Sequence, residues 1–218
     1  SRAENVVEGQ LRMREKYGHD CYYVFQYAAM DVEPWGGKVI FLEDGPPNAA
    51  QPIITATEQI MNLKAPDPLC SPAVMRMLES IRKLKEKTKD DVPIIGCVIS
   101  PFSLPVMQMG FDKYLELIYE EPEAFERLMS VNEEFCVRWA NAQFSAGATA
   151  IAYFDPVSSV TITPPSLSRK TGLAIARRTI ARIKGPAAMH FAAGRCFPLL
   201  DELMTVGTPM IGVSVLEE

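Results

Sequence analysis

Apolar runs alternate with amphipathic stretches over the last two thirds of the chain. The apolar runs contain no Asp, Glu, Lys or Arg, so they are apolar on both faces, as parallel strands covered by helices are. The pattern therefore predicts four buried strands, at residues 92–99, 148–154, 187–191 and 210–215.

Between these runs, apolar residues recur every three or four positions, which is the spacing of a helix with one buried face. The most regular helix opens at Ser71, with Pro72 at its first position. Its apolar stripe comprises Val74, Met77, Leu78, Ile81 and Leu84. The same spacing predicts helices at residues 111–119, 122–147, 165–184 and 198–206.

The first third of the chain is less regular. We expect a helix over residues 1–17 that stops at Gly18, a short strand at 38–42 and a short helix at 57–63. Turns rich in glycine and proline separate these elements.

Alternating strands and helices indicate an α/β protein, either a (β/α)8 TIM barrel or an open doubly wound sheet. No strand end carries the Gly-x-Gly-x-x-Gly loop that is typical of the open sheet, so the barrel is favoured. Only four clear βα units fit, with two more at most in the first third. We expect residues 1–218 to form a single domain that holds an incomplete barrel.

Composition and charge indicate which classes of binding partner to expect. The formal charge is −5 and charges of both signs are mixed, which argues against nucleic-acid binding. The longest uncharged runs are broken by proline, glycine or amide residues, which argues against a membrane span. The five cysteines show no Cys-x-x-Cys spacing, which favours a reducing, cytoplasmic location.

Reactive groups follow three of the predicted strands, and in a barrel these positions share one rim. Asp155 can orient a ligand or act as a base, or it can close an Asx turn. His190 is one of two histidines in the chain. It is either a functional residue or a buried histidine whose ring is hydrogen-bonded to a carbonyl. Arg195 can hold a carboxylate or phosphate, or it can be an ordinary surface residue.

A metal site is a further hypothesis. His190 and Cys196 lie six positions apart across one loop, and a soft ion such as zinc binds both residue types. Two ligands are too few for a zinc site. The alternative is that Cys196 starts the next helix with its sulfur buried.

Four segments, in this order, resemble the uroporphyrinogen decarboxylase superfamily: 96–104 (Gly-Cys-Val-Ile-Ser-Pro-Phe-Ser-Leu), 143–156 ending in Phe-Asp-Pro, 189–191 (Met-His-Phe) and 207–215. Within it, the chain is more similar to the cobamide-dependent methyltransferases that pass methyl groups to thiols such as coenzyme M. The resemblance implies a (β/α)8 barrel with its site at the carboxyl ends of the strands. Members of the family are longer than this chain at both ends.

The chain also departs from the family pattern. The decarboxylases carry an aspartate in a Phe-Ser-Asp-Ile segment that binds pyrrole nitrogens, and Tyr27 stands there in this sequence. The methyltransferases carry a His-x-Cys pair and a later cysteine that hold zinc. Here His190 matches, Ala192 replaces the cysteine, the nearest thiol is Cys196, and the later cysteine would fall past Glu218.

The resemblance implies a methyltransferase that moves a methyl group between a cobamide on a partner corrinoid protein and a small substrate, with zinc as a further cofactor. Its expected catalytic residues are Asp155 and His190, and zinc would bind His190 and Cys196. The expected substrate- or cofactor-binding residues are Tyr27, Pro101, Phe102, Phe154 and Arg195. The alternatives are a decarboxylase of the tetrapyrrole branch and a non-catalytic barrel that binds a tetrapyrrole or a partner.

Overall fold

A curled sheet of parallel strands forms half of a barrel in the computed structural model, which describes residues 2–89 and 91–217. The strand order among the described residues is β1-β4-β5-β6-β7, and every neighbouring pair is parallel. The strands are β1 (Tyr22–Tyr23), β4 (Ile94–Ile99), β5 (Ala150–Phe154), β6 (Ala187–His190) and β7 (Ile211–Gly212). The predicted α/β class and incomplete barrel are confirmed.

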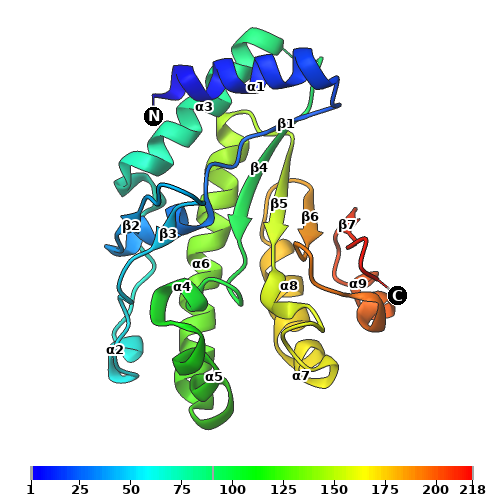
Figure 1. Ribbon diagram of the computed structural model, residues 1–218. Coiled ribbons are helices and arrows are strands. Elements are labelled where there is room, and N and C mark those ends of the chain that lie inside the picture. Colours follow the sequence, from blue (N-terminus) through cyan, green and yellow to red (C-terminus); the bar gives the residue numbers. More distant parts are fainter. Residues whose placement is uncertain (1, 90, 218) are drawn as a thin grey trace.

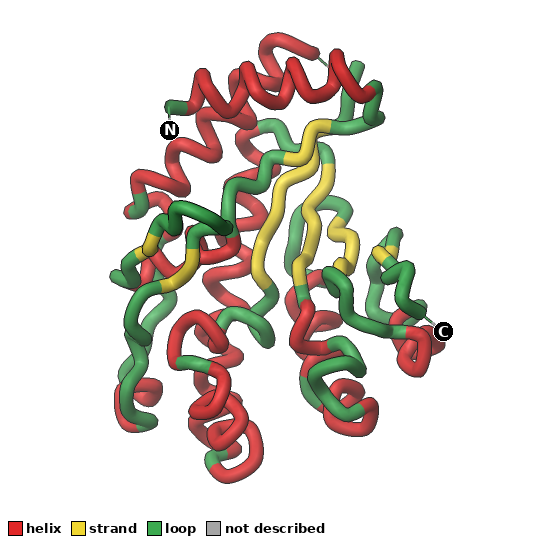
Figure 2. Tube along the Cα trace, in the orientation of Figure 1, coloured by secondary structure: helices red, strands yellow, loops and turns green. Residues whose placement is uncertain are grey.

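Helices surround this sheet, and the long strands β4 and β5 lie at its centre (Figure 2). They are α1 (Ala3–Tyr17), α2 (Glu58–Met61), α3 (Pro72–Thr88), α4 (Pro105–Met109), α5 (Phe111–Glu120), α6 (Pro122–Ala146), α7 (Pro165–Lys170), α8 (Gly172–Ile180) and α9 (Leu200–Leu203). A separate antiparallel pair joins β2 (Val39–Ile40) to β3 (Asn48–Ala49). No helix in the described part of the chain is both long and apolar enough to cross a membrane.

The periodic segments fold as the sequence predicts. The Ser71 hydroxyl accepts hydrogen bonds from the first free N–H groups of α3, and Gly147 ends α6 with a φ of 113°. Helix α1 covers the predicted range, except that Ser1 lies outside the described residues. The sequence pattern does not predict helix α4, since it indicates no helix between residues 100 and 110.

Three predicted ranges need correction. The helix expected at 165–184 is two helices, because the chain turns at Thr171 and Gly172 then packs so closely on Ser158 that a Cβ would lie 2.0 Å from its hydroxyl. The helix expected at 198–206 has a 3-10 turn followed by the short α9. Strand β7 stops at Gly212, and Val215 beyond it is 97% exposed.

Two buried clusters hold the fold together. The larger fills the space between the sheet and helices α3, α6 and α8, with Trp139, Phe135 and Tyr153 among its largest members. The smaller lies between α4, α5 and α6 around Phe102 and Tyr114, whose rings meet at 5.8 Å between centroids. The smaller cluster supports the loop that follows β4.

Where β1 stops pairing with β4, side chains form hydrogen bonds with the free backbone groups of β4. Strand β1 pairs only with Ile94 and Ile95. Beyond that point the Gln143 amide accepts from the Cys97 N–H at 2.9 Å and donates to the Cys97 carbonyl at 2.8 Å. The Asp31 carboxylate accepts from the Ile99 N–H at 2.9 Å. These contacts satisfy backbone groups that would otherwise be buried without partners.

Burial raises the pKa of Asp31 to about 7, although its bonds from the Ile99 N–H and the Trp139 indole N–H oppose the rise. The folded chain therefore binds this proton more tightly than the unfolded chain, whose carboxyl has a normal, lower pKa. The contribution of Asp31 to stability is then full at low pH and is lost as the pH rises towards 7.

We predict that the substitution Asp31→Asn removes this dependence. Between pH 5 and pH 8, the free energy of unfolding of the Asn variant should rise relative to the unsubstituted chain by on the order of 2 kcal/mol. Urea titrations of both proteins at the two pH values measure the difference. Equal changes with pH in the two proteins would show that Asp31 titrates as an ordinary carboxyl.

Candidate functional site

The carboxyl ends of β4, β5 and β6, with the loops that follow them, form one rim of the half-barrel, which we call the mouth (Figure 1). Asp155 lies at its centre. One carboxylate oxygen accepts from the Ser100 hydroxyl at 2.6 Å and from the Ser103 hydroxyl at 2.8 Å, and the other accepts from the Ser158 hydroxyl at 2.6 Å. A single carboxylate thus ties the loop after β4 to the loop after β5.

The surroundings of Asp155 define what it can do. The side chain has no exposed surface, and burial raises its pKa, while the three serine hydroxyls oppose the rise. The Asp155 backbone N–H also donates to the His190 carbonyl at 2.8 Å. Asp155 is therefore placed to position the loops and the end of β6, and a direct catalytic role for it stays a prediction.

His190 ends β6 beside a row of partly exposed aromatic rings. Its imidazole meets Phe154 edge-on at 5.4 Å between ring centroids, and Phe154 lies 6.2 Å from Phe25. Gly212 on β7 leaves room for the ring, because a Cβ there would lie 3.0 Å from the His190 Nδ1 atom. His190 is thus only partly buried at the mouth, where a ligand can reach it.

A cavity of about 250 Å³ opens between the ends of β4 and β5. Its walls include Ala28, Ile99, Val106, Met107, Phe154 and Val157. Ser103 is the polar member of the lining, and its hydroxyl is already bonded to Asp155 and to the Val157 N–H. None of the described residues that line this cavity carries a charge.

Other predicted residues lie in the core. Phe102 has no exposed surface and packs against Tyr114 and Phe125, so as placed it offers no wall to a cofactor. Pro101 is buried beside it, and its carbonyl accepts from the Asn132 amide at 3.4 Å. The binding roles expected of these residues stay predictions, and their visible role is support of the loop after β4.

Tyr27 faces the β2–β3 side of the molecule. Its hydroxyl donates to Glu33 at 2.9 Å, and its ring meets Phe41 edge-on at 5.6 Å. Burial, followed by the bond to Glu33, raises the pKa of Tyr27 to about 12. Tyr27 therefore remains neutral and donates a hydrogen bond, where the family resemblance implies a carboxylate in the decarboxylases.

Arg195 and Cys196 lie in the loop after β6. The Arg195 side chain is exposed, and its backbone is bonded to Thr161 and Val160. The Cys196 sulfur is buried, its N–H donates to Glu217, and burial together with Glu217 raises the pKa of the thiol to about 12. Cys196 is therefore a neutral, buried thiol. This agrees with the alternative interpretation, in which its sulfur is buried at the start of the next helix.

The described side chains around His190 do not form the ligand set of a zinc site. Within residues 2–89 and 91–217, no group of three or more His, Cys, Asp or Glu side chains is placed to hold a metal ion. The expected pair, His190 and Cys196, supplies two ligands, whereas a zinc site takes three or four from the protein. The described residues therefore do not fit a zinc site.

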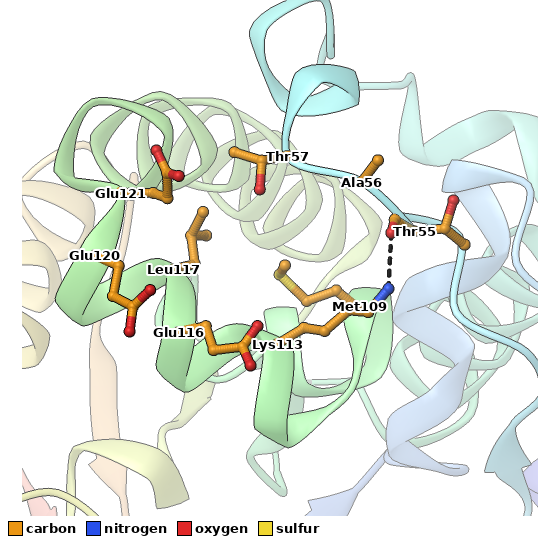
Figure 3. Close-up of a pocket in the computed structure, with 9 residues that line it drawn as sticks. All are labelled: Thr55, Ala56, Thr57, Met109, Lys113, Glu116, Leu117, Glu120 and Glu121. Carbon is orange, nitrogen blue, oxygen red and sulfur yellow. Dashed lines mark hydrogen bonds between the residues drawn. The ribbon is translucent and has the colours of Figure 1, made fainter.

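A second cavity, of about 210 Å³, lies along α5 and the segment 55–57 (Figure 3). Glu116, Glu120 and Glu121 border it, and the Lys113 ammonium donates to the Thr55 carbonyl at 2.7 Å. Among the described residues, it shares no lining residue with the mouth cavity and has none from a strand end. The mouth is therefore the better candidate site.

Sequence reasoning missed the serines that fix the mouth. No role is predicted from the sequence for Ser103 or Ser158, although both bond to Asp155. The available signal was the density of small hydroxyl residues directly after two neighbouring strands, beside a buried acid.

Comparisons with known proteins agree with this architecture. A family model described as Uroporphyrinogen decarboxylase (URO-D) matches residues 1–216. The chain is 27% identical over 172 residues to the methylcobamide:CoM methyltransferase MtaA of Methanosarcina barkeri, covering 77% of the chain and 50% of MtaA. It is 28% identical over 218 residues to the uroporphyrinogen decarboxylase of Carboxydothermus hydrogenoformans, covering 96% of the chain and 61% of that enzyme.

A solved methyltransferase from Methanosarcina mazei shares the fold, with a TM-score of 0.89 and 20% identity, over 96% of this chain and 62% of that protein. The chain thus spans between half and about three fifths of the length of these relatives.

We predict that Asp155→Ala lowers the free energy of unfolding by at least about 3 kcal/mol, because three buried hydroxyls lose their acceptor. Ser158→Ala, which removes one donor, should cost about 1 kcal/mol. The exposed Asp201→Ala serves as the matched control and should stay within about 0.5 kcal/mol. Urea unfolding measures all three, and a loss at Asp155 no larger than at Asp201 would contradict the proposed bracing.

Proposed function

The chain belongs to the uroporphyrinogen decarboxylase (URO-D) family, and on this premise we propose that it transfers methyl groups between a cobamide carried by a partner corrinoid protein and a small substrate such as a thiol. Both methyltransferases and decarboxylases are among its relatives, so sequence similarity alone does not separate the two activities.

The observation that carries the proposal is the uncharged cavity at the mouth. Uroporphyrinogen is a polycarboxylated tetrapyrrole, and burying its carboxylates without cationic partners would cost several kcal/mol each. The neutral Tyr27, which donates a hydrogen bond to Glu33, supplies no carboxylate for the pyrrole N–H groups. A small substrate with few charges suits this lining better.

The roles proposed for the chain's residues follow from their placement. His190 takes the proton that a thiol substrate loses as the methyl group arrives, since a ring nitrogen of a neutral imidazole can accept a proton. Phe154 holds the ring of His190 and forms part of the cavity wall. Asp155 acts through the loops it positions, and the exposed Arg195 would bind a charged group of the cobamide at the rim, outside the mouth cavity. When bound, the cobamide would supply or accept the methyl group.

Two broader proposals accompany this one. We propose that residues 1–218 form one domain, because a single core cluster contains side chains from Val7 to Val206. We also propose a cytoplasmic location, which is supported by five cysteines that are all free thiols.

Decarboxylation is the second candidate, favoured by the match to the Carboxydothermus enzyme over 96% of the chain. A barrel that binds a tetrapyrrole or partner without turnover is the third. The three differ in what they do to a methylated corrinoid protein and to uroporphyrinogen.

We predict that the protein consumes methyl groups from a methylated corrinoid protein when a small thiol is present, which the visible absorbance of the corrinoid reports. His190→Gln should slow the transfer by at least about 100-fold, because the proton acceptor is removed. His19→Gln is the matched control, since His19 is the other histidine of the chain and lies just after α1. It should keep the original rate.

Release of carbon dioxide from uroporphyrinogen, with no change in the corrinoid, would replace the proposal by the second candidate. Corrinoid binding without turnover would support the third.

A further inference from the structure

The lining of the mouth cavity indicates what kind of ligand it can hold. Its walls are aliphatic and aromatic, and the described lining carries no charged side chain. The Ser103 hydroxyl donates to Asp155 and accepts from the Val157 N–H, so it offers little to a ligand. A ligand group that enters this space exchanges water for an almost entirely apolar surface.

The size of the cavity limits what can enter. An apolar cavity of about 150 Å³ in another protein stays dry and binds benzene. The mouth cavity measures about 250 Å³. It therefore has room for one six-membered ring with a small substituent, and a tetrapyrrole would not fit inside it.

The cavity and the candidate catalytic position share Phe154. Phe154 lines the cavity on one side and meets the His190 imidazole edge-on at 5.4 Å on another. Phe111 and Ile162, about two fifths exposed, also line the cavity, so it is open to solvent. A ligand seated against Phe154 would thus lie near His190.

We propose that the small substrate of this site has a neutral, apolar body of about one ring, which occupies the mouth cavity. The relative MtaA is named for coenzyme M, a small anionic thiol, and the uncharged lining indicates a different preference. The identification of this ligand as the substrate rests on the proposed function, whereas its binding is measured without any methyl transfer.

The test uses methyl-labelled methionine in the intact protein, because Met107 lines the cavity and its methyl signal reports on the contents. Met107→Leu identifies that signal. The exposed Met204 is the internal control. The probes are methoxybenzene, benzoate, which has a similar size and a negative charge, and coenzyme M.

We expect methoxybenzene to shift the Met107 signal in a saturable way and to leave the Met204 signal in place. Benzoate and coenzyme M should bind at least about tenfold more weakly there, because their charges would be buried without a partner.

Filling the cavity provides the matching variant. Val106→Phe places a ring in the cavity and should weaken methoxybenzene binding at least about tenfold. Val215→Phe makes the same change at a position that is 97% exposed and should leave binding unchanged. Circular dichroism and the melting temperature verify that both variants fold.

The possible failures are distinct. No response of Met107 to methoxybenzene, equal or tighter binding of the anions, or unchanged binding in Val106→Phe would each overturn the inference, even in a protein that transfers methyl groups. Tight binding of methoxybenzene in a protein with no transfer activity would uphold the binding site and would remove only the proposed function.

Discussion

The mouth of this half-barrel depends on one buried carboxylate. Asp155 accepts hydrogen bonds from three serines on two loops, and its own N–H reaches the end of β6. Without it, the loops after β4 and β5 would lose the Ser100 and Ser103 bonds to Asp155, and the bond from the Val157 N–H to the Ser103 hydroxyl would remain between them. The burial of this charge is costly, and its three hydroxyl donors offset the cost. A rigid rim with a defined cavity is the result.

Once Asp155 and its serines have bonded to one another, an apolar cavity surface and the His190 imidazole remain available to a ligand. Because Asp155 and Ser103 satisfy each other, the cavity between the loops presents mainly hydrocarbon and aromatic surface. The partly exposed group with acid–base chemistry nearby is the His190 imidazole, held between Phe154 and the space above Gly212. An apolar chamber beside an imidazole suits a small molecule with few charges better than the binding of many carboxylates.

The sequence predicts some elements of this molecule well and misses others. The elements that it predicts depend on local patterns, whereas those it misses depend on contacts between distant parts of the chain. Helices α3 and α6 and strands β4 and β5 have apolar patterns and capping residues that act locally, so their ranges were predicted to within a few residues. The break at Thr171 was missed, because it depends on contact between Gly172 and a distant loop. The same holds for Asp31, whose carboxylate replaces a strand partner that local pattern does not reveal. Phe102 was expected at the rim because it follows a strand, but its ring turns into the smaller core cluster.

Native-state hydrogen exchange at the Ser103 and Val157 amides tests the central claim most directly. Ser103 donates to the Ser100 hydroxyl and Val157 donates to the Ser103 hydroxyl, so both amides are bonded to serines that Asp155 holds. If one carboxylate fixes both loops, the two amides should be protected and should open with nearly equal free energies. Rapid exchange at either amide, while the amides of β5 stay protected, would show that the two loops move independently and would contradict the account.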